Sequence, residues 1–170
     1  MATVDSLFVD PQANKPKAAT NKEPVQKTAA PKSNPGKLSV VSGAATPAGT
    51  RYEAEAGSLS GGAHPRDASD ASGGVLLAGM KGATCSVSVD GGVDGAAELT
   101  IRYATAKKAF CTLTLNGVSQ DLELPASGGW NTLGSVSITV EIKPGKNPLE
   151  FTSQSGMKLD CFDLLIKPLN

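Results

Sequence analysis

The run Ser135-Val-Ser-Ile-Thr-Val-Glu-Ile142 decides how this chain folds, because polar and apolar residues alternate along it. Successive side chains of a β-strand point to opposite faces, so the pattern places the apolar side chains together on one face. β-Branched residues dominate the run, and these residues suit half-buried strands. The run therefore predicts a strand with one face in a core.

The same period of two recurs in further runs, at 84–89, 97–103, 110–115 and 148–152. Glycine-containing turn sequences separate these runs, and Asn116-Gly117 is the strongest candidate for a hairpin turn. No window shows the stripe of an amphipathic helix. Closely spaced strands with turns between them predict an all-β domain, a two-sheet β-sandwich.

Residues 1–50 differ in composition from the rest of the chain. They hold six of the eleven prolines, and six lysines against three acidic residues, whereas residues 51–170 carry ten basic and thirteen acidic residues. A Pro/Lys/Ala-rich segment of this kind cannot bury enough apolar surface to offset the entropy lost on ordering. We expect residues 1–36 to be a disordered linker and residues 37–170 to form the sandwich.

Several partner classes are not expected. The lysines of the N-terminal segment are dispersed, whereas an arm that binds nucleic acid carries denser basic runs, so no nucleic-acid partner is predicted. No apolar run reaches the length of about 18 residues that a membrane span needs, so no membrane partner is predicted. The N-terminus also lacks the basic and apolar regions of a secretory signal.

The chain has three cysteines, Cys85, Cys111 and Cys161, with no CxxC pair among them. Because the single histidine, His64, is far from all three in sequence, a zinc site is not expected. Each cysteine falls in a strand-like run, which favours small buried apolar side chains. One disulfide among the three remains an open alternative.

Three acidic residues suggest a cation site. In an extended strand the carboxylates of Glu53 and Glu55 leave the same face, roughly 7 Å apart. Asp160 opens the last strand-like run and could meet them from the other end of the domain. Oxygen ligands from the first and last strands favour a structural calcium ion. The alternatives are that Glu53 and Glu55 only form the solvent face of an edge strand, or that Asp163 replaces Asp160.

Eight short pieces of sequence, in this order, resemble a carbohydrate-binding module of the family 6 / family 35 type. They are 52–55, 59–63, 71–74, 99–104, 115–117, 128–130, 142–149 and 159–162. From the first piece to the last, the resemblance spans nearly the whole of residues 51–167. The resemblance implies a galactose-binding-like jelly roll that is not an enzyme and has no catalytic residues.

The resemblance also implies a cofactor, partners and a location. A structural Ca²⁺ ion would be held by Glu53, Glu55, the backbone carbonyl of about Val75, and Asp160. The partner would be a polysaccharide or oligosaccharide. A covalently linked catalytic domain would be held near that polysaccharide, which raises its effective concentration. The expected location is extracellular or the cell surface.

A sugar site is expected in loops at one edge of the sandwich. Sugars stack their C–H faces on aromatic rings, and Trp130 follows Gly128-Gly129, which favours a loop position. A buried core tryptophan is the alternative. Asn131 beside it could bind a sugar hydroxyl or only complete the turn. Ser153 and Gln154 are further loop candidates on position alone.

Two departures from the family pattern bear on the sugar. Many relatives carry a second aromatic residue near the position of Gly79, and no aromatic residue lies between Tyr52 and Tyr103 here. Relatives also often carry asparagine where this chain has Lys158. Together with Arg66 and His64, Lys158 would favour a uronic acid or another anionic glycan. The alternative is that Lys158 is solvated and the sugar site has been lost.

These observations leave two functions open and argue against a third. The first is non-catalytic carbohydrate binding that targets an appended enzyme to a polysaccharide, one that contains uronic acid or other anionic sugars. The second is a calcium-stabilised structural or adhesion β-sandwich that has lost sugar binding. An enzyme is not expected, because His64 has no nucleophile partner in any motif and no pair of carboxylates for glycoside hydrolysis stands out.

Overall fold

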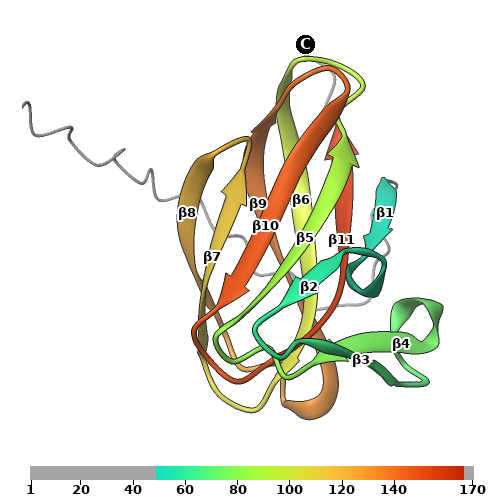
Figure 1. Cartoon of the computed structure of the whole chain (residues 1–170), viewed down its shortest axis with the longest axis vertical. Coiled ribbons are helices and arrows are strands. Elements are labelled where there is room, and N and C mark those ends of the chain that lie inside the picture. The colour runs from blue at the N-terminus through green and yellow to red at the C-terminus, as the bar shows by residue number, and fades with distance from the viewer. Residues whose placement is uncertain (1–48, 167–170) are drawn as a thin grey trace, which may run out of the picture. The chain divides into compact units, whose positions relative to one another are not determined.

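The structure is a computed structural model that describes residues 49–166. The expected linker, residues 1–36, and residues 37–48 and 167–170 of the expected sandwich lie outside the described part. Residues 49–166 form two antiparallel sheets that lie face to face (Figure 1). The prediction of an all-β, two-sheet β-sandwich is therefore confirmed.

The first sheet contains six strands in the order β3-β4-β11-β6-β9, with β1 also paired to β11. Their bounds are β1 Thr50–Glu53, β3 His64–Asp67, β4 Val75–Ala78, β6 Gly95–Thr105, β9 Gly129–Ile142 and β11 Lys158–Ile166.

The second sheet contains five strands in the order β2-β5-β10-β7-β8. Their bounds are β2 Ser58–Ser60, β5 Ala83–Asp90, β7 Ala109–Leu115, β8 Val118–Leu124 and β10 Lys146–Ser153. Two 3₁₀ turns, η1 (Ala54–Ala56) and η2 (Ser72–Gly74), are the helical elements among the described residues, and no helix in this part is long and apolar enough to cross a membrane.

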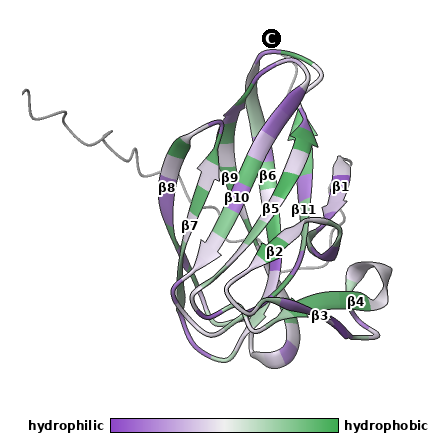
Figure 2. Ribbon diagram, viewed as in Figure 1, coloured by the Kyte–Doolittle hydropathy of each residue, from purple (hydrophilic) through white to green (hydrophobic). Residues whose placement is uncertain are grey.

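The core lies between the two sheets and follows from the alternation in the sequence. Apolar and polar residues alternate along the long strands (Figure 2), and the apolar ones are buried between the sheets. Phe151 of β10 meets Phe162 of β11 across this core, with ring centroids 5.9 Å apart. Because these strands belong to different sheets, the aromatic pair ties the two layers together.

The hairpin predicted at Asn116-Gly117 is present and joins β7 to β8. Asn116 has φ 53° and Gly117 has φ 81°. Two successive positive φ angles are the signature of a type I′ turn, whose twist matches that of the strands it connects. All three cysteines are buried and free, so the disulfide alternative is not realised.

One irregularity of the first sheet positions the candidate site. β6 occupies one edge of β11, so β4 and β1 share the other edge. β4 pairs with β11 at Leu159, and β1 pairs with it from Cys161 onward. The register between β11 and β6 also shifts between Leu159 and Cys161, which makes Asp160 the extra residue of a β-bulge. Bulges of this kind often redirect side chains at functional sites.

Candidate functional site

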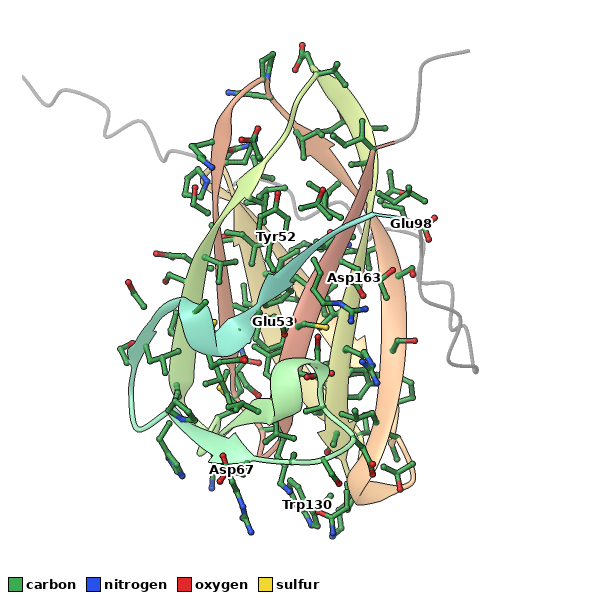
Figure 3. The ribbon with its side chains drawn as sticks, turned by 90° about the vertical axis from the view of Figure 1, so that its right-hand side faces the viewer. Tyr52, Glu53, Asp67, Glu98, Trp130 and Asp163 are labelled. Carbon is green, nitrogen blue, oxygen red and sulfur yellow. The ribbon has the colours of Figure 1, made fainter. Side chains whose placement is uncertain are left out.

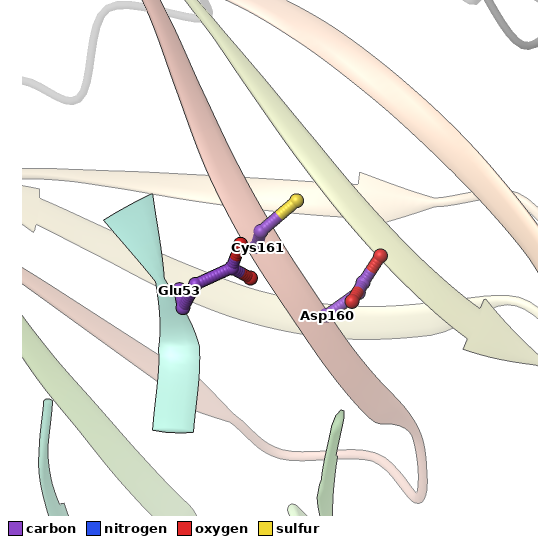
Figure 4. A group of neighbouring side chains, drawn as sticks. All are labelled: Glu53, Asp160 and Cys161. Carbon is purple, nitrogen blue, oxygen red and sulfur yellow. The ribbon is translucent and has the colours of Figure 1, made fainter. Parts of the chain in front are cut away.

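The bulge at Asp160 explains why an acidic side chain and its neighbour leave the same face of β11. Leu159 and Phe162 both lie in the core, although they are three residues apart. A regular strand would place them on opposite faces, so the extra residue at the bulge must restore the pattern. Asp160 and Cys161 then both lie on the face away from the core, beside Glu53 (Figure 4).

Glu53 and Glu55 approach this point by a different route from the one expected. Glu53 ends β1, and Glu55 lies in the 3₁₀ turn η1, whose Ala54 is fully buried. The expectation of an extended strand through both glutamates is therefore wrong. Ala54 anchors the turn in the core and interrupts the strand, so the two carboxylates are brought together by a turn.

The turn η2 closes over the three carboxylates. The backbone N–H of Ser72 donates to Asp160 Oδ1 at 2.9 Å, and its hydroxyl donates to Glu53 Oε1. A side chain at Gly73 would lie 3.6 Å from Glu55 Oε1, so this backbone passes directly over Glu55. Gly73 has φ 63°, a conformation that glycine adopts without strain.

Three buried carboxylate oxygens at this point lack a hydrogen-bond donor. They are Glu53 Oε2, Glu55 Oε2 and Asp160 Oδ2, and no other buried side-chain oxygen or nitrogen among residues 49–166 is left in this state. Unsatisfied buried polar atoms are costly, so their concentration at one place points to a missing partner. Arg102 Nη1 lies 3.3 Å from Asp160 Oδ2 and offsets part of the charge.

The electrostatics are consistent with a missing cation. The pKa of Asp160 is raised to about 6, mainly by burial and also by the nearby Glu53 and Glu55 carboxylates, which together outweigh the lowering effects of Ser72 and Arg102. Burial also raises the pKa of Glu55. Both directions mean that the ionised forms are disfavoured when nothing neutralises them. A divalent cation would remove this penalty.

Asp163 has another partner. Arg51 Nε and Nη2 donate to its two carboxylate oxygens at 2.7 and 3.0 Å, and Arg51 Nη1 also donates to Ser72 Oγ. This bidentate pair holds β1 to β11 just beyond the three carboxylates. Val75 opens β4 directly after η2 and is half-buried. The role of its backbone carbonyl as a fourth ligand remains a prediction.

We call Glu53, Glu55, Asp160 and the covering turn η2 the acidic cluster. Its donor atoms are hard carboxylate oxygens, held by the paired strands β1 and β11 and by the turn η1 between β1 and β2. Calcium takes such oxygen ligands in flexible geometry, so the donor set fits the expected ion.

A pocket of about 400 Å³ opens at the ends of β3, β6, β9 and β11. Figure 3 shows Asp67 and Trp130 at this end of the sandwich, with Glu53 and Asp163 further along the same flank. The volume falls in the range that holds small ligands. The pocket is lined by Arg66, Asp67, Ala68, Ser69, Asp70, Ala71, Leu76, Ala104, Trp130, Asn131, Leu133 and Lys158.

Trp130 provides the aromatic surface of this pocket. It lies at the start of β9, and 48% of its surface is exposed, so it occupies neither a loop nor the buried core. The chain enters β9 through Gly128, whose φ of 108° suits glycine. A side chain at Gly156 would lie 3.4 Å from the edge of the indole ring, so this glycine leaves room for Trp130.

The polar groups of the pocket are charged but balanced in sign. Lys158 Nζ donates to Asn131 Oδ1 at 3.1 Å, which orders both predicted residues beside Trp130. Arg66 contributes a second positive charge to the lining. Asp67 and Asp70 contribute two negative charges to the same lining.

Four of the seven sugar-site candidates named from the sequence lie together in the pocket lining, namely Arg66, Trp130, Asn131 and Lys158. His64 is exposed, bonds to the carbonyl of Gly62 through Nδ1, and is not part of the pocket lining. Gln154 directly follows β10 of the second sheet, and its Nε2 donates to Thr112 Oγ1 of β7 at 2.9 Å. Ser153 is fully buried and also outside the lining.

Several residues of both sites were not predicted. Asp67 and Asp70 flank a short polar segment between two family motifs, and that position is a signal that could have identified them. Arg102 was quoted only as part of an alternating run. Its role depends on the β6–β11 pairing, which sequence spacing does not reveal.

A β-sandwich with an open, aromatic-lined pocket at its strand ends and an acidic cluster on its flank belongs to the class of carbohydrate-binding modules. The carbohydrate binding module (family 6) matches residues 53–165, and the chain belongs to this family. Modules of this family bind carbohydrate and are in general not catalytic. No curated protein matches the chain by sequence.

Solved structures give the same picture of the fold. The exo-β-1,3-galactanase of Phanerochaete chrysosporium, solved with β-1,3-galactotriose, is 26% identical over 68% of this chain, with a TM-score of 0.63. The chain spans only 29% of that galactanase. A family 35 carbohydrate binding module from Clostridium thermocellum is 24% identical over 68% of this chain and 98% of its own, with a TM-score of 0.64.

A third structure resembles the chain over a small part of its own length. It is an uncharacterized protein from Listeria monocytogenes, solved in complex with glucose, magnesium and calcium. It is 23% identical over 68% of this chain and 12% of its own, with a TM-score of 0.63. At this identity the likeness concerns the fold alone.

Proposed function

We propose that this module binds a glycan in the pocket beside Trp130 and carries a linked enzyme to a polysaccharide. The observation that supports this most directly is the indole ring, which is half-exposed and packed against Gly156 at a pocket of sugar size. Stacking of sugar C–H groups on such a ring is the main apolar contribution to glycan affinity. Lys158 and Asn131 supply polar groups beside it.

The glycan class we propose is one that contains uronic acid or another anionic sugar. Lys158 uses one of its N–H groups on Asn131 and has others to offer to a carboxylate. Because Asp67 and Asp70 also line the pocket and would repel an anion, we expect the anionic group next to Lys158 and the neutral hydroxyls next to the aspartates. The pocket would then select a glycan by the position of its anionic group as well as by its charge.

A structural calcium ion in the acidic cluster is the second part of the proposal, with Glu53, Glu55, Asp160 and the Val75 carbonyl as ligands. Its support is the set of three buried carboxylate oxygens that lack donors. The Listeria protein named above was solved with calcium, among other ligands. Bound only to the folded state, the ion stabilises the fold by mass action.

The linked enzyme and an extracellular or cell-surface location complete the proposal. The galactanase of which this chain spans a minor part is an enzyme that contains a similar sandwich. The Pro/Lys/Ala-rich residues 1–36 would act as the tether between module and enzyme. Modules of this kind raise the effective concentration of the enzyme at its substrate.

The test is calorimetric titration of the full chain, in calcium, with oligosaccharides that contain uronic acid and with neutral ones. Trp130→Ala should weaken binding by about 2 kcal/mol, or roughly thirtyfold in Kd, as for a central aromatic anchor. Phe110→Ala is the matched control, because Phe110 is 52% exposed but lies on the second sheet, away from the pocket.

Three outcomes would decide the proposal. Loss of binding in Trp130→Ala alone supports the pocket. Loss of binding in Phe110→Ala alone would assign the glycan site to the second sheet and overturn the proposal. Absence of binding to either glycan class by the unaltered chain favours the calcium-stabilised adhesion sandwich instead.

A further inference from the structure

Cys161 adds a sulfur atom to the acidic cluster. It is paired across the strands with Glu53, and the bulge brings it to the same face as Asp160. One ligand atom of each of the three residues, Sγ for Cys161 and a carboxylate oxygen for the other two, lies within 4.8 Å of the others (Figure 4). In the tetrahedral shell of a zinc-like ion, sulfur and oxygen ligands lie roughly 3.6 Å apart. A small closure of the side chains is enough to bring all three to one ion.

A second observation shows that this group of atoms lacks a ligand. Asp160 is 0% exposed, and its Oδ2 accepts no hydrogen bond although Arg102 lies nearby. Glu53 Oε2 is buried in the same state on the other side of Cys161. Two unsatisfied carboxylate oxygens therefore flank a buried thiol.

From this arrangement we infer that Cys161 Sγ is a metal ligand, and that the cluster accepts a thiophilic divalent cation such as Zn²⁺ or Cd²⁺ in exchange for calcium. The inference rests on the cation site proposed above and concerns which ions that site selects. Thiolate is a soft ligand that zinc and cadmium prefer, whereas calcium gains little from sulfur. On binding, the metal–sulfur bond replaces the S–H bond and the proton passes to solvent.

The other two cysteines have different surroundings. Cys111 Sγ points to the carbonyl of Leu122 in the core, and Cys85 Sγ donates to the carbonyl of Ala54. Among residues 49–166, Cys161 is the cysteine that joins acidic side chains in a group suited to a metal. Cys111→Ala therefore removes a buried thiol without touching the cluster.

The experiment titrates the full chain, free of calcium, with Cd²⁺ and follows the thiolate-to-metal charge-transfer absorption in the ultraviolet. The unaltered chain should show the band and saturate at one equivalent. Cys161→Ser keeps a hard oxygen in place of sulfur, so it should lose the band. It should also bind Cd²⁺ more weakly by about tenfold or more, since even outer partners of a metal cost that much.

Calcium titration of the same variants separates this inference from the proposed function. Cys161→Ser should keep calcium affinity within about threefold, because calcium is held by oxygen ligands. Cys111→Ala should behave as the unaltered chain toward both ions, and circular dichroism confirms that each variant is folded.

Three results would overturn the inference. If the chain binds calcium but Cd²⁺ produces no band, Cys161 is not a ligand while the calcium site stands. If the band persists in Cys161→Ser, another thiol binds the metal. If neither ion binds, the cation site of the proposed function fails together with its soft-metal extension.

Discussion

The acidic cluster and the pocket lie on the same flank of the sandwich but differ in burial and in electrostatics. The cluster is buried, carries oxygens without donors, and disfavours its own ionised state. The pocket is open, its charges are balanced, and its aromatic ring is already positioned against Gly156. The first region therefore requires a partner to be stable, whereas the second only offers a surface to one.

Two residues connect these regions. Ser72 donates to Asp160 and Glu53, and it directly follows the pocket residue Ala71. Arg102 reaches Asp160 with one nitrogen and the backbone carbonyl of Asp70 with another, at 3.3 and 3.4 Å. A change in the cluster should consequently reach the pocket through the segment between Asp67 and Ser72, and binding at the two places should be coupled equally in both directions.

The largest effect is expected from Asp160→Asn. The change removes a proposed calcium ligand and leaves Arg102 beside a neutral amide, so the free energy of unfolding in calcium should fall by about 3 kcal/mol. Chelation should lower the melting temperature of the unaltered chain and leave that of the variant unchanged. Asp94→Asn, at an exposed turn residue, is the control in urea denaturation. If chelator lowers the melting temperature of the unaltered chain and of Asp160→Asn equally, the acidic cluster is not the site of the cation.

The second effect concerns pH in protein stripped of calcium on a chelating resin. The pKa of Asp160 is about 6 in the folded chain against an ordinary 3.8, mainly because of burial. The folded state then holds a proton that the unfolded state has lost, so stability is highest below the unfolded pKa. The free energy of unfolding should fall by on the order of 2 kcal/mol as pH rises from about 4 to 6.

Calcium should reverse this trend, since the ion binds the deprotonated ligands and stabilises more at higher pH. Urea denaturation across this pH range, with and without calcium, measures both slopes. Asp160→Asn should remove most of the calcium-free slope and leave a smaller part from Glu55, whose pKa is also raised by burial. A calcium-free slope of the opposite sign would show that Asp160 is not a costly buried carboxylate.

A smaller effect should pass from the cluster to the pocket in Ser72→Ala. The variant loses the hydroxyl bonds to Glu53 and Arg51 but keeps the backbone N–H that donates to Asp160. We expect a loss of about 1 kcal/mol in stability and a rise of about threefold in glycan Kd. Ser119→Ala removes a comparable hydroxyl bond, to Thr114, on the second sheet and should leave glycan affinity unchanged. If Ser72→Ala and Ser119→Ala bind glycan with equal affinity, the acidic cluster and the pocket are not coupled.

The fold could be predicted because it depends on local alternation, which the sequence displays directly in strands such as β9 and β10 and in the Asn116-Gly117 turn. The acidic cluster could be predicted from the sequence only in part. Glu53, Glu55 and Asp160 could be named, but the bulge at Asp160 and the turn at Glu55 arise from pairing with β6 and burial of Ala54. Such long-range effects have no signal in spacing, which is why Cys161 and Arg102 were assigned no role there.

The pocket shows the same limit. Trp130 and Lys158 could be placed together from the family pattern, but Asp67 and Asp70 join them only because β3 and β4 fold back along β11. Gln154 was a loop candidate on position alone, and between it and Lys158 the chain turns from one sheet to the other. Position along the chain was therefore a poor guide wherever a connection changes sheets.

The smallest effect tests which glycan the pocket selects. Lys158→Gln keeps hydrogen-bond donors but removes the charge, so affinity for a glycan that contains uronic acid should fall by about 0.5 kcal/mol, the scale of an exposed ion pair. Affinity for a neutral glycan should stay the same. Lys81→Gln, at an exposed lysine outside the pocket lining, controls for net charge. The loss should also shrink in high salt, because screening weakens the pair. If Lys158→Gln weakens neutral and anionic glycans equally, Lys158 acts through its hydrogen bond to Asn131, and the balanced charges of the pocket carry no preference for an anion.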